Sequence, residues 1–311
     1  MTSVTLRGYR DSDLPALVAL VNASDRVDKA GFATTATTLA HSLATPGSSP
    51  AEDVLLAEQG GQLVGYVRLV ARSSEDGDRV IVLGIVHPAW RRRGVGTALM
   101  RRAEERAAGF KTGKLLFFEM PARSPVAGAA ELAMSRGMRP VRYFSYMECE
   151  DLQRQEAPVL PVGMWIRPYV VGQDEATFVP AYNAGFSDHW GYSPHSLDKE
   201  LHRVSDPTFR AEDNLVAVDQ DGRITGLCIL VFPQTEGNLP MVDDLAVVPS
   251  YRRRGIGRAL LLAGLRRIRE EGYSTAGIAV DSEHPNKAFR LYESVGFAPK
   301  AQSAVYRKEL A

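Results

Sequence analysis

Hydrophobic and polar positions follow the same order of predicted elements twice along the chain. An apolar, β-branched run predicts a strand at Val4–Tyr9 and another at Met164–Tyr169. Helical patterns follow at Asp13–Ala23 and, roughly, at Asp174–Ala184. After a variable segment, two apolar runs around a glycine-containing turn predict a hairpin in each half. These hairpins are Val54–Glu58 with Leu63–Val70, and Leu215–Asp219 with Ile224–Phe232.

The correspondence continues to the end of each half. It comprises third strands at Val80–Val86 and Met241–Val247, amphipathic helices at Gly96–Ala108 and Gly257–Glu271, and buried strands at Lys114–Glu119 and Thr275–Val280. Another helix and a final strand complete each half. Antiparallel strands followed by strand–helix–strand units predict the fold class α/β, with a twisted mixed sheet flanked by helices in each half.

Residue identities show that the two halves are copies of one domain. RRRGVGTAL begins at Arg91 and RRRGIGRAL begins at Arg252, an offset of 161 residues (252 − 91). The same offset relates Gly61 to Gly222, Gly65 to Gly226, Val86 to Val247 and Pro88 to Pro249. A long internal repeat of this kind predicts two tandem domains. We expect domains at residues 1–150 and 164–311, joined by a polar, proline-containing linker at residues 151–163.

Composition and charge narrow the class of protein. The length of 311 residues fits two domains of about 150 residues each. Basic and acidic residues balance at 37 each, which argues against nucleic acid as a partner. No apolar run reaches the ~20 residues of a membrane span, and the first residues lack the apolar core of a secretory signal. We therefore expect no association with a membrane.

Cysteine and histidine usage argues against disulfides and metal. Cys149 and Cys228 are the only cysteines and lie in different halves, so a buried thiol at each position and a cytoplasmic location are expected. No helix-spaced histidine pair with acidic support occurs, so no metal site is expected. The chain is expected to be a monomer, with its halves as a pseudo-dimer, or a homodimer.

The repeated arginine–glycine motif has the pattern of a phosphate-binding loop. A strand that enters R-x-x-G-x-G and leaves as a helix presents unpaired backbone N–H groups at the positive end of the helix dipole. Glycine allows close approach and unusual backbone conformations, and arginine adds charge-assisted hydrogen bonds. The P-loop does not match, because neither copy supplies its Gly-Lys-Ser/Thr. The dinucleotide fingerprint does not match, because Leu99 and Leu260 occupy the place of its third glycine. A solvated glycine turn remains the alternative.

Both halves resemble the GCN5-related N-acetyltransferase (GNAT) superfamily, whose pyrophosphate signature is Q/R-x-x-G-x-G/A. The second half carries DDLAVVPSYRRRGIGRAL, the strand GIAV and then NKAFRLYESVGF. The resemblance covers essentially the whole chain, once per half. It implies two tandem GNAT folds and an acetyltransferase that uses acetyl-CoA, releases coenzyme A and acts on a small-molecule or peptide amine. The duplicated layout also resembles that of mycothiol synthases, although Met241 stands where a catalytic glutamate is expected for them.

The resemblance also implies which residues bind the cofactor. In the family, acetyl-CoA lies where two parallel strands splay apart, and its pantetheine arm bonds to strand backbone. In the second half the implied contacts are Leu245, Ala246, Val247, Arg252, Arg253, Arg254, Gly255, Ile256, Gly257, Arg258 and Asn286. In the first half they are Val86, Arg91, Arg92, Arg93, Gly94, Val95, Gly96 and Thr97.

Acetyl transfer to an amine needs a base for the ammonium proton and an acid for the departing thiolate. Tyr292 matches the family tyrosine near the thioester sulfur and is the expected acid; a core aromatic is the alternative. Strand alternation places Asp243 on the face of Leu245 and Val247, which favours Asp243 as the base. Asp244 would then face the other way, with a structural or substrate-orienting role. A solvated pair of aspartates is the competing interpretation.

The first half lacks these groups. The repeat places Val82 and Leu83 opposite the acidic couple, and Ala133 opposite Tyr292. We therefore expect the chemistry in the second half and a catalytically degenerate first half that still holds coenzyme A. A coenzyme A-binding sensor or scaffold without catalysis is the alternative of another class, and a protein N-acetyltransferase is a further enzyme alternative.

The acceptor is expected against the variable segment of the second half. That segment, FSDHWGYSPHSLDKE, is rich in polar and aromatic side chains. The candidate substrate-binding residues are Asp188, His189, Trp190, Tyr192 and Asp244, and His195 lies close by in the sequence. Exposed histidines and aromatic side chains that cover the core are the alternative.

Overall fold

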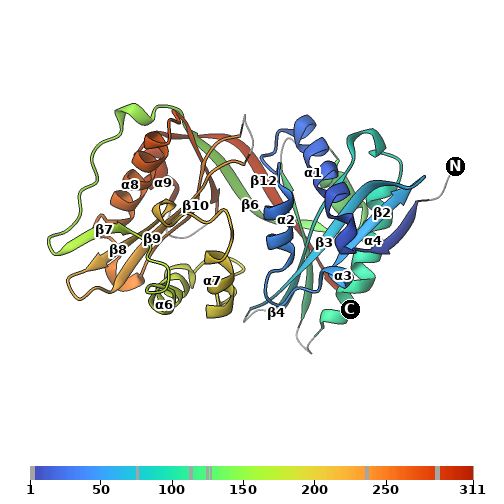
Figure 1. Cartoon of the computed structure of the whole chain (residues 1–311), viewed down its shortest axis with the longest axis horizontal. Coiled ribbons are helices and arrows are strands. Elements are labelled where there is room, and N and C mark those ends of the chain that lie inside the picture. Colours follow the sequence, from blue (N-terminus) through green and yellow to red (C-terminus); the bar gives the residue numbers. More distant parts are fainter. Residues whose placement is uncertain are drawn as a thin grey trace. The chain divides into compact units, whose positions relative to one another are not determined.

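The computed structural model describes residues 4–74, 77–111, 115–123, 126, 128–234, 238–283 and 288–310. The chain forms two compact units. The first comprises Met1–Tyr143 with Ser303–Ala311, and the second comprises Phe144–Gln302. Each unit is a mixed sheet flanked by helices, as the sequence predicts (Figure 1).

In the first unit the strand order is β1-β2-β3-β4-β5-β12. The strands are β1 (Thr5–Gly8), β2 (Val54–Gln59), β3 (Gln62–Ser74), β4 (Gly77–Val86), β5 (Leu116–Arg123) and β12 (Phe297–Leu310). The helices are α1 (Leu14–Asp28), α2 (Ala36–Leu43), α3 (Pro50–Asp53), α4 (Val95–Ala107) and α5 (Ala129–Ser135). Only β4 and β5 are parallel to each other; the other pairs of this unit are antiparallel.

In the second unit the strand order is β6-β11-β10-β9-β8-β7. The strands are β6 (Arg139–Cys149), β7 (Met164–Pro168), β8 (Asn214–Asp219), β9 (Ile224–Val231), β10 (Met241–Val247) and β11 (Ala276–Asp281). The helices are α6 (Glu175–Phe186), α7 (Leu197–Val204), α8 (Ile256–Glu270) and α9 (Ala288–Glu293). Single 3-10 turns are η1 (Asp11–Asp13), η2 (Pro88–Trp90), η3 (Ala108–Phe110), η4 (Leu152–Arg154), η5 (Ala211–Asp213) and η6 (Pro249–Tyr251).

The last strand of each sequence half belongs to the unit of the other half. β6 pairs with β11 from Phe144 to Cys149, and β12 pairs with β5 from Ser303 to Leu310. The compact units therefore differ from the predicted ranges 1–150 and 164–311 by this exchange. The predicted linker at residues 151–163 begins inside the fold, because Leu152 is fully buried in the core of the second unit.

Helices cover both faces of each sheet. In the first unit α4 packs on one face around Leu99, and α1 and α2 pack on the other around Leu17. In the second unit α8 and α9 pack on one face around Leu260, and α6 packs on the other around Phe178. The sheets are buried on both faces, which explains their near-continuous apolar runs. Figure 1 shows helices on both sides of the strands in each unit.

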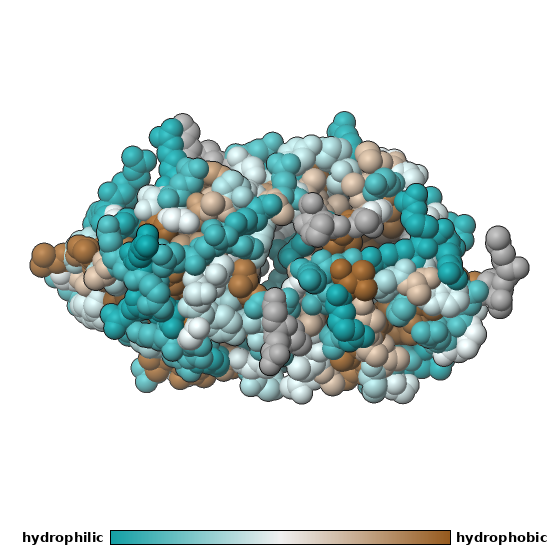
Figure 2. Space-filling model, turned by 90° about the horizontal axis from the view of Figure 1, so that it is seen from above, coloured by the Kyte–Doolittle hydropathy of each residue, from teal (hydrophilic) through white to brown (hydrophobic). Residues whose placement is uncertain are grey.

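The surface is mostly hydrophilic on the face seen in Figure 2, where hydrophobic residues are scattered in small groups. The described helices are each too short or too polar to cross a membrane. Cys149 and Cys228 are buried free thiols. Burial raises the pKa of both thiols, that of Cys228 to about 12.

Candidate active site

The two parallel strands of the second unit pair over only part of their length. β10 and β11 are paired at Met241–Gly277 and Val242–Ile278. Beyond this point β11 continues along β6, whereas β10 continues along β9 to Val247. Within the described range, the rest of β10 has no pairing with β11. The two strands thus form a V-shaped opening, and the backbone of β10 can bond an extended ligand there as a further strand would.

The first unit has the same opening. β4 and β5 pair from Asp78–Leu116 to Ile81–Glu119, after which β5 continues along β12. Both openings have the form that the family resemblance implies for a pantetheine arm.

A β-bulge lies in β10 at the acidic couple. Val242 pairs with Leu230 and Asp244 pairs with Ile229, which leaves Asp243 as the extra, exposed residue. In contrast, β4 of the first unit pairs with β3 without a register shift. The bulge is therefore a property of the second copy.

The bulge corrects the predicted orientation of the acidic couple. Val242, Leu245 and Val247 all pack against the core under α8, which a strand without a bulge would not allow. The alternation that placed Asp243 on the face of Leu245 and Val247 does not hold across the bulge. Asp244 lies on the α6 face, where its Oδ2 accepts a hydrogen bond of 3.1 Å from the hydroxyl of Tyr182.

Each phosphate loop ends in a glycine with a left-handed backbone. Gly255 caps α8 with φ of 85°, and Gly94 caps α4 with φ of 84°. Arg253 and Arg92 also have positive φ, and Lys29 is the one other described non-glycine residue that shares this feature. Such strain, repeated at the same position of both loops, curves the backbone around the first amides of the helix. That geometry binds anions.

The first arginine of the second loop holds the loop in place. Arg252 donates hydrogen bonds to the carbonyl oxygens of Val247 at 3.0 Å and Gly185 at 2.9 Å. Its guanidinium also forms a two-pronged ion pair with Asp188, at 2.6 and 3.2 Å. The ion pair ties Asp188, just after α6, to the loop.

The equivalent arginine of the first loop does the same. Arg91 donates to the carbonyl oxygen of Val86 at 3.1 Å, to the carboxylate of Asp28 at 2.7 and 2.5 Å, and to the hydroxyl of Ser24 at 2.9 Å. Arg253 and Arg92 are exposed at the turn of each loop. Ile256 and Val95 are buried at the start of the following helices. Gly257 and Gly96 lie in the first helical turns, and a Cβ at Gly257 would make ordinary contact with Val247 at 3.5 Å.

Other residues of the second loop are partly engaged. Arg254 donates to the carbonyl oxygen of Ser250 at 3.1 Å, and Arg258 pairs with the exposed Glu156 at 3.1 Å. Such exposed pairs contribute little stability and are readily replaced by a ligand phosphate. In the first loop Arg93 lies over the ring of Trp90, and Thr97 is exposed on α4.

Tyr292 lies on α9 in the core beside the opening. Its side chain is 7% exposed and packs edge-on against Phe297. Burial raises the pKa of its hydroxyl, and the charges of Cys228 and Asp244 add to the rise. Among the described residues no hydrogen bond engages this hydroxyl. Tyr292 is thus both a core aromatic and a protonated donor at neutral pH. Asn286, the expected contact to the cofactor arm, lies outside the described residues.

Aromatic side chains line the α6 face next to Asp244. The ring of Tyr182 lies 4.6 Å from that of Phe186 and 4.9 Å from that of His195. His189 packs on Phe186 at 4.7 Å. Of the other predicted acceptor contacts, Trp190 packs edge-on against Phe144 at 6.5 Å, and burial raises the pKa of the Tyr192 hydroxyl. Aromatic faces beside carboxylates suit a cationic amine.

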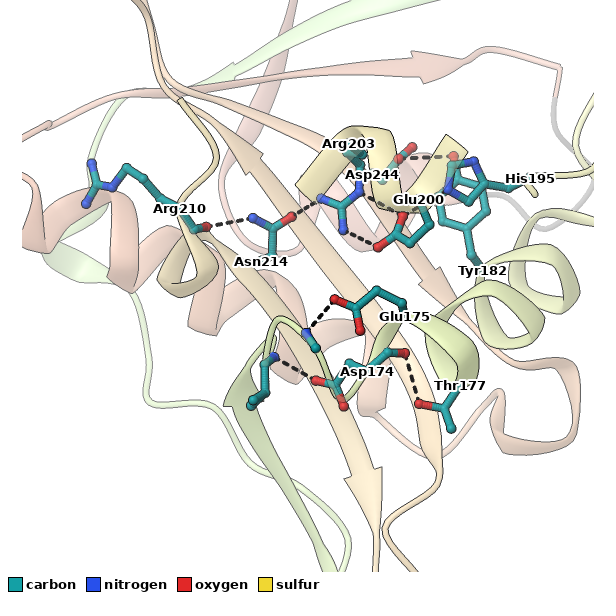
Figure 3. A network of polar contacts seen from close by, with 12 residues as sticks. Asp174, Glu175, Thr177, Tyr182, His195, Glu200, Arg203, Arg210, Asn214 and Asp244 are labelled. Atoms are coloured by element: carbon teal, nitrogen blue, oxygen red, sulfur yellow. Dashed lines mark hydrogen bonds and ion pairs between the residues drawn. The ribbon is translucent and has the colours of Figure 1, made fainter. Parts of the chain in front are cut away.

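A buried carboxylate anchors this aromatic surface (Figure 3). Glu200 is fully buried and lies 2.9 Å from Nε2 of His195, and it accepts two hydrogen bonds from Arg203 at 2.7 and 3.0 Å. Arg203 also donates to Asn214 at 2.5 Å. Burial opposes ionisation of Glu200, but the hydrogen bonds from His195 and Arg203 outweigh burial and lower its pKa to about 2. Glu200 is therefore a carboxylate anion at neutral pH.

Sequence reasoning did not identify Tyr182, Glu200 or Arg203. The repeat carries a signal that would have found Glu200, because the equivalent residue of the first half is the apolar Leu39 (200 − 161). A charge that replaces a leucine in one copy points to a role outside the shared fold. In the part of the chain that the structure describes, no group of three or more His, Cys, Asp or Glu side chains is placed to hold a metal ion.

Comparison with known proteins agrees with this geometry. Residues 178–297 match the model of the "Acetyltransferase (GNAT) family", and residues 50–130 match the "Acetyltransferase (GNAT) domain". A mycothiol acetyltransferase from Thermomonospora curvata is 33% identical over 256 residues, 81% of this chain and 81% of the relative. Another, from Thermobispora bispora, is 31% identical over 300 residues, 95% of this chain and 96% of the relative.

A solved structure supports the tandem arrangement. The crystal structure of a GCN5-related N-acetyltransferase from Sphaerobacter thermophilus matches with a TM-score of 0.74 at 26% identity. The match covers 98% of this chain and 95% of that protein.

Proposed function

Because the chain belongs to the GNAT acetyltransferase family and is an acetyl-CoA-dependent N-acetyltransferase, we propose that its second half transfers the acetyl group to a primary amine. One observation carries this proposal. In the second unit Asp244 of the acidic couple lies close enough to Tyr292 for its charge to add to the raised pKa of the Tyr292 hydroxyl, after the larger effect of burial. In the sequence repeat the first unit carries Val82 and Leu83 opposite the acidic couple and Ala133 opposite Tyr292, and none of these three side chains can exchange protons.

The donor site uses backbone more than side chains. The backbone at the edge of β10 forms hydrogen bonds with the extended pantetheine arm of acetyl-CoA. The first backbone amides of α8, together with Arg253, Arg254 and Arg258, bind the phosphates of acetyl-CoA. The donor supplies the acetyl thioester. We propose the same kind of binding for the loop of the first unit, which binds coenzyme A or braces the fold without transferring acetyl.

Proton handling falls to three side chains. The acidic couple Asp243 and Asp244 takes a proton from the incoming ammonium, and the neutral amine then forms its N–C bond as the C–S bond breaks. Tyr292 gives a proton to the departing sulfur, and the second proton that the nitrogen loses restores the Tyr292 hydroxyl. A buried hydroxyl with a raised pKa is protonated at neutral pH and suits this role.

The acceptor is a small-molecule amine. The mycothiol acetyltransferases among the relatives support a small acceptor, and the aromatic surface around Tyr182 supports one that carries positive charge. Met241 stands where the resemblance to mycothiol synthases predicts a glutamate, so the base of this chain differs from that pattern. Two buried free thiols are compatible with reaction in the reducing cytoplasm.

A thiol-release assay tests the proposed function. Purified protein, acetyl-CoA and a panel of amines (glucosamine, putrescine, spermidine and cysteinyl glucosamine) should release coenzyme A with at least one acceptor. Tyr292→Phe should lower kcat by about 100-fold and leave the KM for acetyl-CoA unchanged. Full activity of Tyr292→Phe on a good acceptor would exclude Tyr292 as the acid. Activity retained in a chain with both Asp243 and Asp244 replaced by asparagine would exclude the acidic couple as the base.

A further inference from the structure

A chain of contacts runs from Asp244 into the core of the second unit. We call Tyr182, His195, Glu200, Arg203 and Asp244 the acceptor network. Its links are the hydrogen bond from Tyr182 to Asp244, the contact between the tilted rings of Tyr182 and His195, and the bonds from His195 and Arg203 to Glu200 (Figure 3). Figure 3 shows Tyr182 and His195 lying together at the end of the network that is nearest Asp244.

The first unit is an internal control for what the fold itself requires. At the equivalent positions, 161 residues earlier, it carries Val21, Thr34, Leu39, Ser42 and Leu83. All five members of the network are replaced by residues that cannot ionise. The first copy of the same fold packs with these residues in place, so the network is not needed to form the fold.

The framework around the network is kept in both units. The side-chain amide of Asn183 forms two hydrogen bonds with the backbone of His195, at 2.8 and 2.9 Å. The side-chain amide of Asn22 bonds the backbone of Thr34 in the same way, at 2.8 and 3.0 Å. The N-cap of α7, Ser196, corresponds to Thr35 of α2. Shared structural contacts persist while the ionisable side chains differ. This contrast separates the role of the network from that of the fold.

Buried charge makes the same point energetically. Glu200 is fully buried, and a buried ion pair offsets its own desolvation at best. A leucine, as in the first unit, would fill such a position without that cost. We therefore attribute the charge of Glu200 to its effect on the neighbouring side chains and not to a contribution to the stability of the fold.

We propose that Tyr182 is a positioning residue that orients Asp244 as the base toward the acceptor amine, and that Glu200 holds Tyr182 in place through His195. This inference rests on the proposed function and assigns the base within the acidic couple. The anionic Glu200 accepts a hydrogen bond from Nε2 of His195, which fixes the ring. The ring supports Tyr182, whose hydroxyl donates to Oδ2 of Asp244 and sets the direction of the carboxylate.

Several charged or titratable groups face Asp244. They are Tyr182 from α6, Cys228 from β9, Tyr292 from α9 and the neighbouring Asp243 of β10. Of these, Tyr182 donates a hydrogen bond from its hydroxyl to the Asp244 carboxylate. Loss of that hydroxyl removes a stabilising partner of the ionised form, so the base becomes protonated at higher pH.

Tyr182→Phe tests the proposal, because it removes only the hydroxyl. With the best amine of the panel, the acid limb of the kcat/KM profile should move to higher pH by about one unit. The KM for acetyl-CoA should stay unchanged, since the donor site lies along β10 and the loop. Tyr251→Phe is the matched control. It removes a tyrosine–aspartate hydrogen bond of 2.7 Å, to Asp219, and should leave the acid limb in place.

A second set of variants uses residues that the first unit already tolerates. His195→Thr, and the double change Glu200→Leu with Arg203→Ser, copy Thr34, Leu39 and Ser42. We expect folded proteins by thermal melting, and kcat lowered by about 10-fold with the acid limb displaced as in Tyr182→Phe. A wild-type kcat and acid limb in these variants would show that the network is only structural and would overturn the proposal.

A readout without turnover separates this inference from the proposed function. The Asp244 carboxyl can be followed by carbon-13 NMR, assigned with Asp244→Asn, while pH is varied. Its titration midpoint should lie higher in Tyr182→Phe than in wild type, and an unchanged midpoint would overturn the positioning role. Absence of coenzyme A release by the wild-type protein with every amine would instead overturn the proposed function, while the titration still decides the role of Tyr182.

Discussion

At the residue scale, the two neighbouring acids of β10 occupy different environments. Asp243 is the exposed residue of a bulge, and Asp244 accepts a hydrogen bond from Tyr182 on the face lined by aromatic rings. Asp244 is also close enough to Tyr292 to raise the pKa of its hydroxyl, after the larger effect of burial. Asp244 is therefore engaged on the aromatic face, whereas Asp243 is exposed.

We predict that the two asparagine substitutions differ in effect. Asp244→Asn should lower kcat by about 100-fold or more, because it removes a general base without changing shape. Asp243→Asn should have a much smaller effect and serves as the matched control, since it makes the same chemical change one residue away. Thiol release measured across pH for both variants checks this, and the reverse order of effects would return the base to Asp243.

Glu200 gives a prediction for stability against pH. Its pKa in the folded protein, about 2, lies below the ordinary value of 4.5, because the bonds from His195 and Arg203 outweigh burial. A lowered carboxyl pKa stabilises the fold fully above pH 4.5, and this contribution is lost as the pH falls toward 2.

The double variant Glu200→Leu with Arg203→Ser lacks this contribution. Its free energy of unfolding should therefore change less than that of wild type as the pH falls from 4.5 to 2. Urea unfolding of both proteins across that window measures the difference, and parallel curves would contradict the assignment of a charged Glu200.

At the element scale, the sequence predicts regular elements well and their irregularities poorly. Hydrophobic periodicity and turn glycines predicted strands close to β4 and β10 and helices close to α4 and α8. The bulge at Asp243 shifts the alternation by one residue, so that Val242, Leu245 and Val247 face the same core, whereas the sequence prediction took the alternation as continuous. The pairing of Arg252 with Asp188 was also missed, because it joins residues 64 positions apart.

The start of α8 illustrates what the motif did predict. Gly255 has a φ of 85°, and a Cβ there would meet no atom within 4 Å. Gly94 of the first unit has the same conformation and the same open surroundings. Alanine at either site would thus be strained by its backbone alone and not by a clash.

We predict that Gly255→Ala destabilises the protein by about 1–2 kcal/mol and raises the KM for acetyl-CoA, because the loop amides turn away from the phosphates. Gly94→Ala should carry a similar stability cost and leave turnover unchanged, since we propose that the second unit alone transfers acetyl. Thermal melting and thiol-release kinetics measure the two effects. An equal loss of turnover in both variants would show that the first loop also serves the reaction.

At the scale of the whole molecule, duplication explains the fold, and divergence explains the site. Both copies keep the splayed strands, the glycine cap and the arginine that holds the loop. Among the residues that the structure describes, only those of the second copy form the bulge and the acceptor network. The repeat could be predicted from the sequence because it preserves residue identities. The exchange of β6 and β12 could not, because either copy of the final strand fits the same pattern.

This exchange makes domain boundaries testable. A fragment of residues 144–302 contains the whole second unit, including the part of β6 that pairs with β11. The predicted linker and second domain together span residues 151–311, a fragment that lacks that strand. Without β6, the edge of β11 from Ala276 to Asp281 would lose its antiparallel partner and expose unpaired backbone.

We predict that the first fragment, residues 144–302, is monomeric, gives a dispersed amide NMR spectrum and releases coenzyme A with a good amine. The second, similar in length, should aggregate or stay unfolded. A well-folded, active 151–311 fragment would show that β6 is dispensable and that the unit closes within its own half of the sequence.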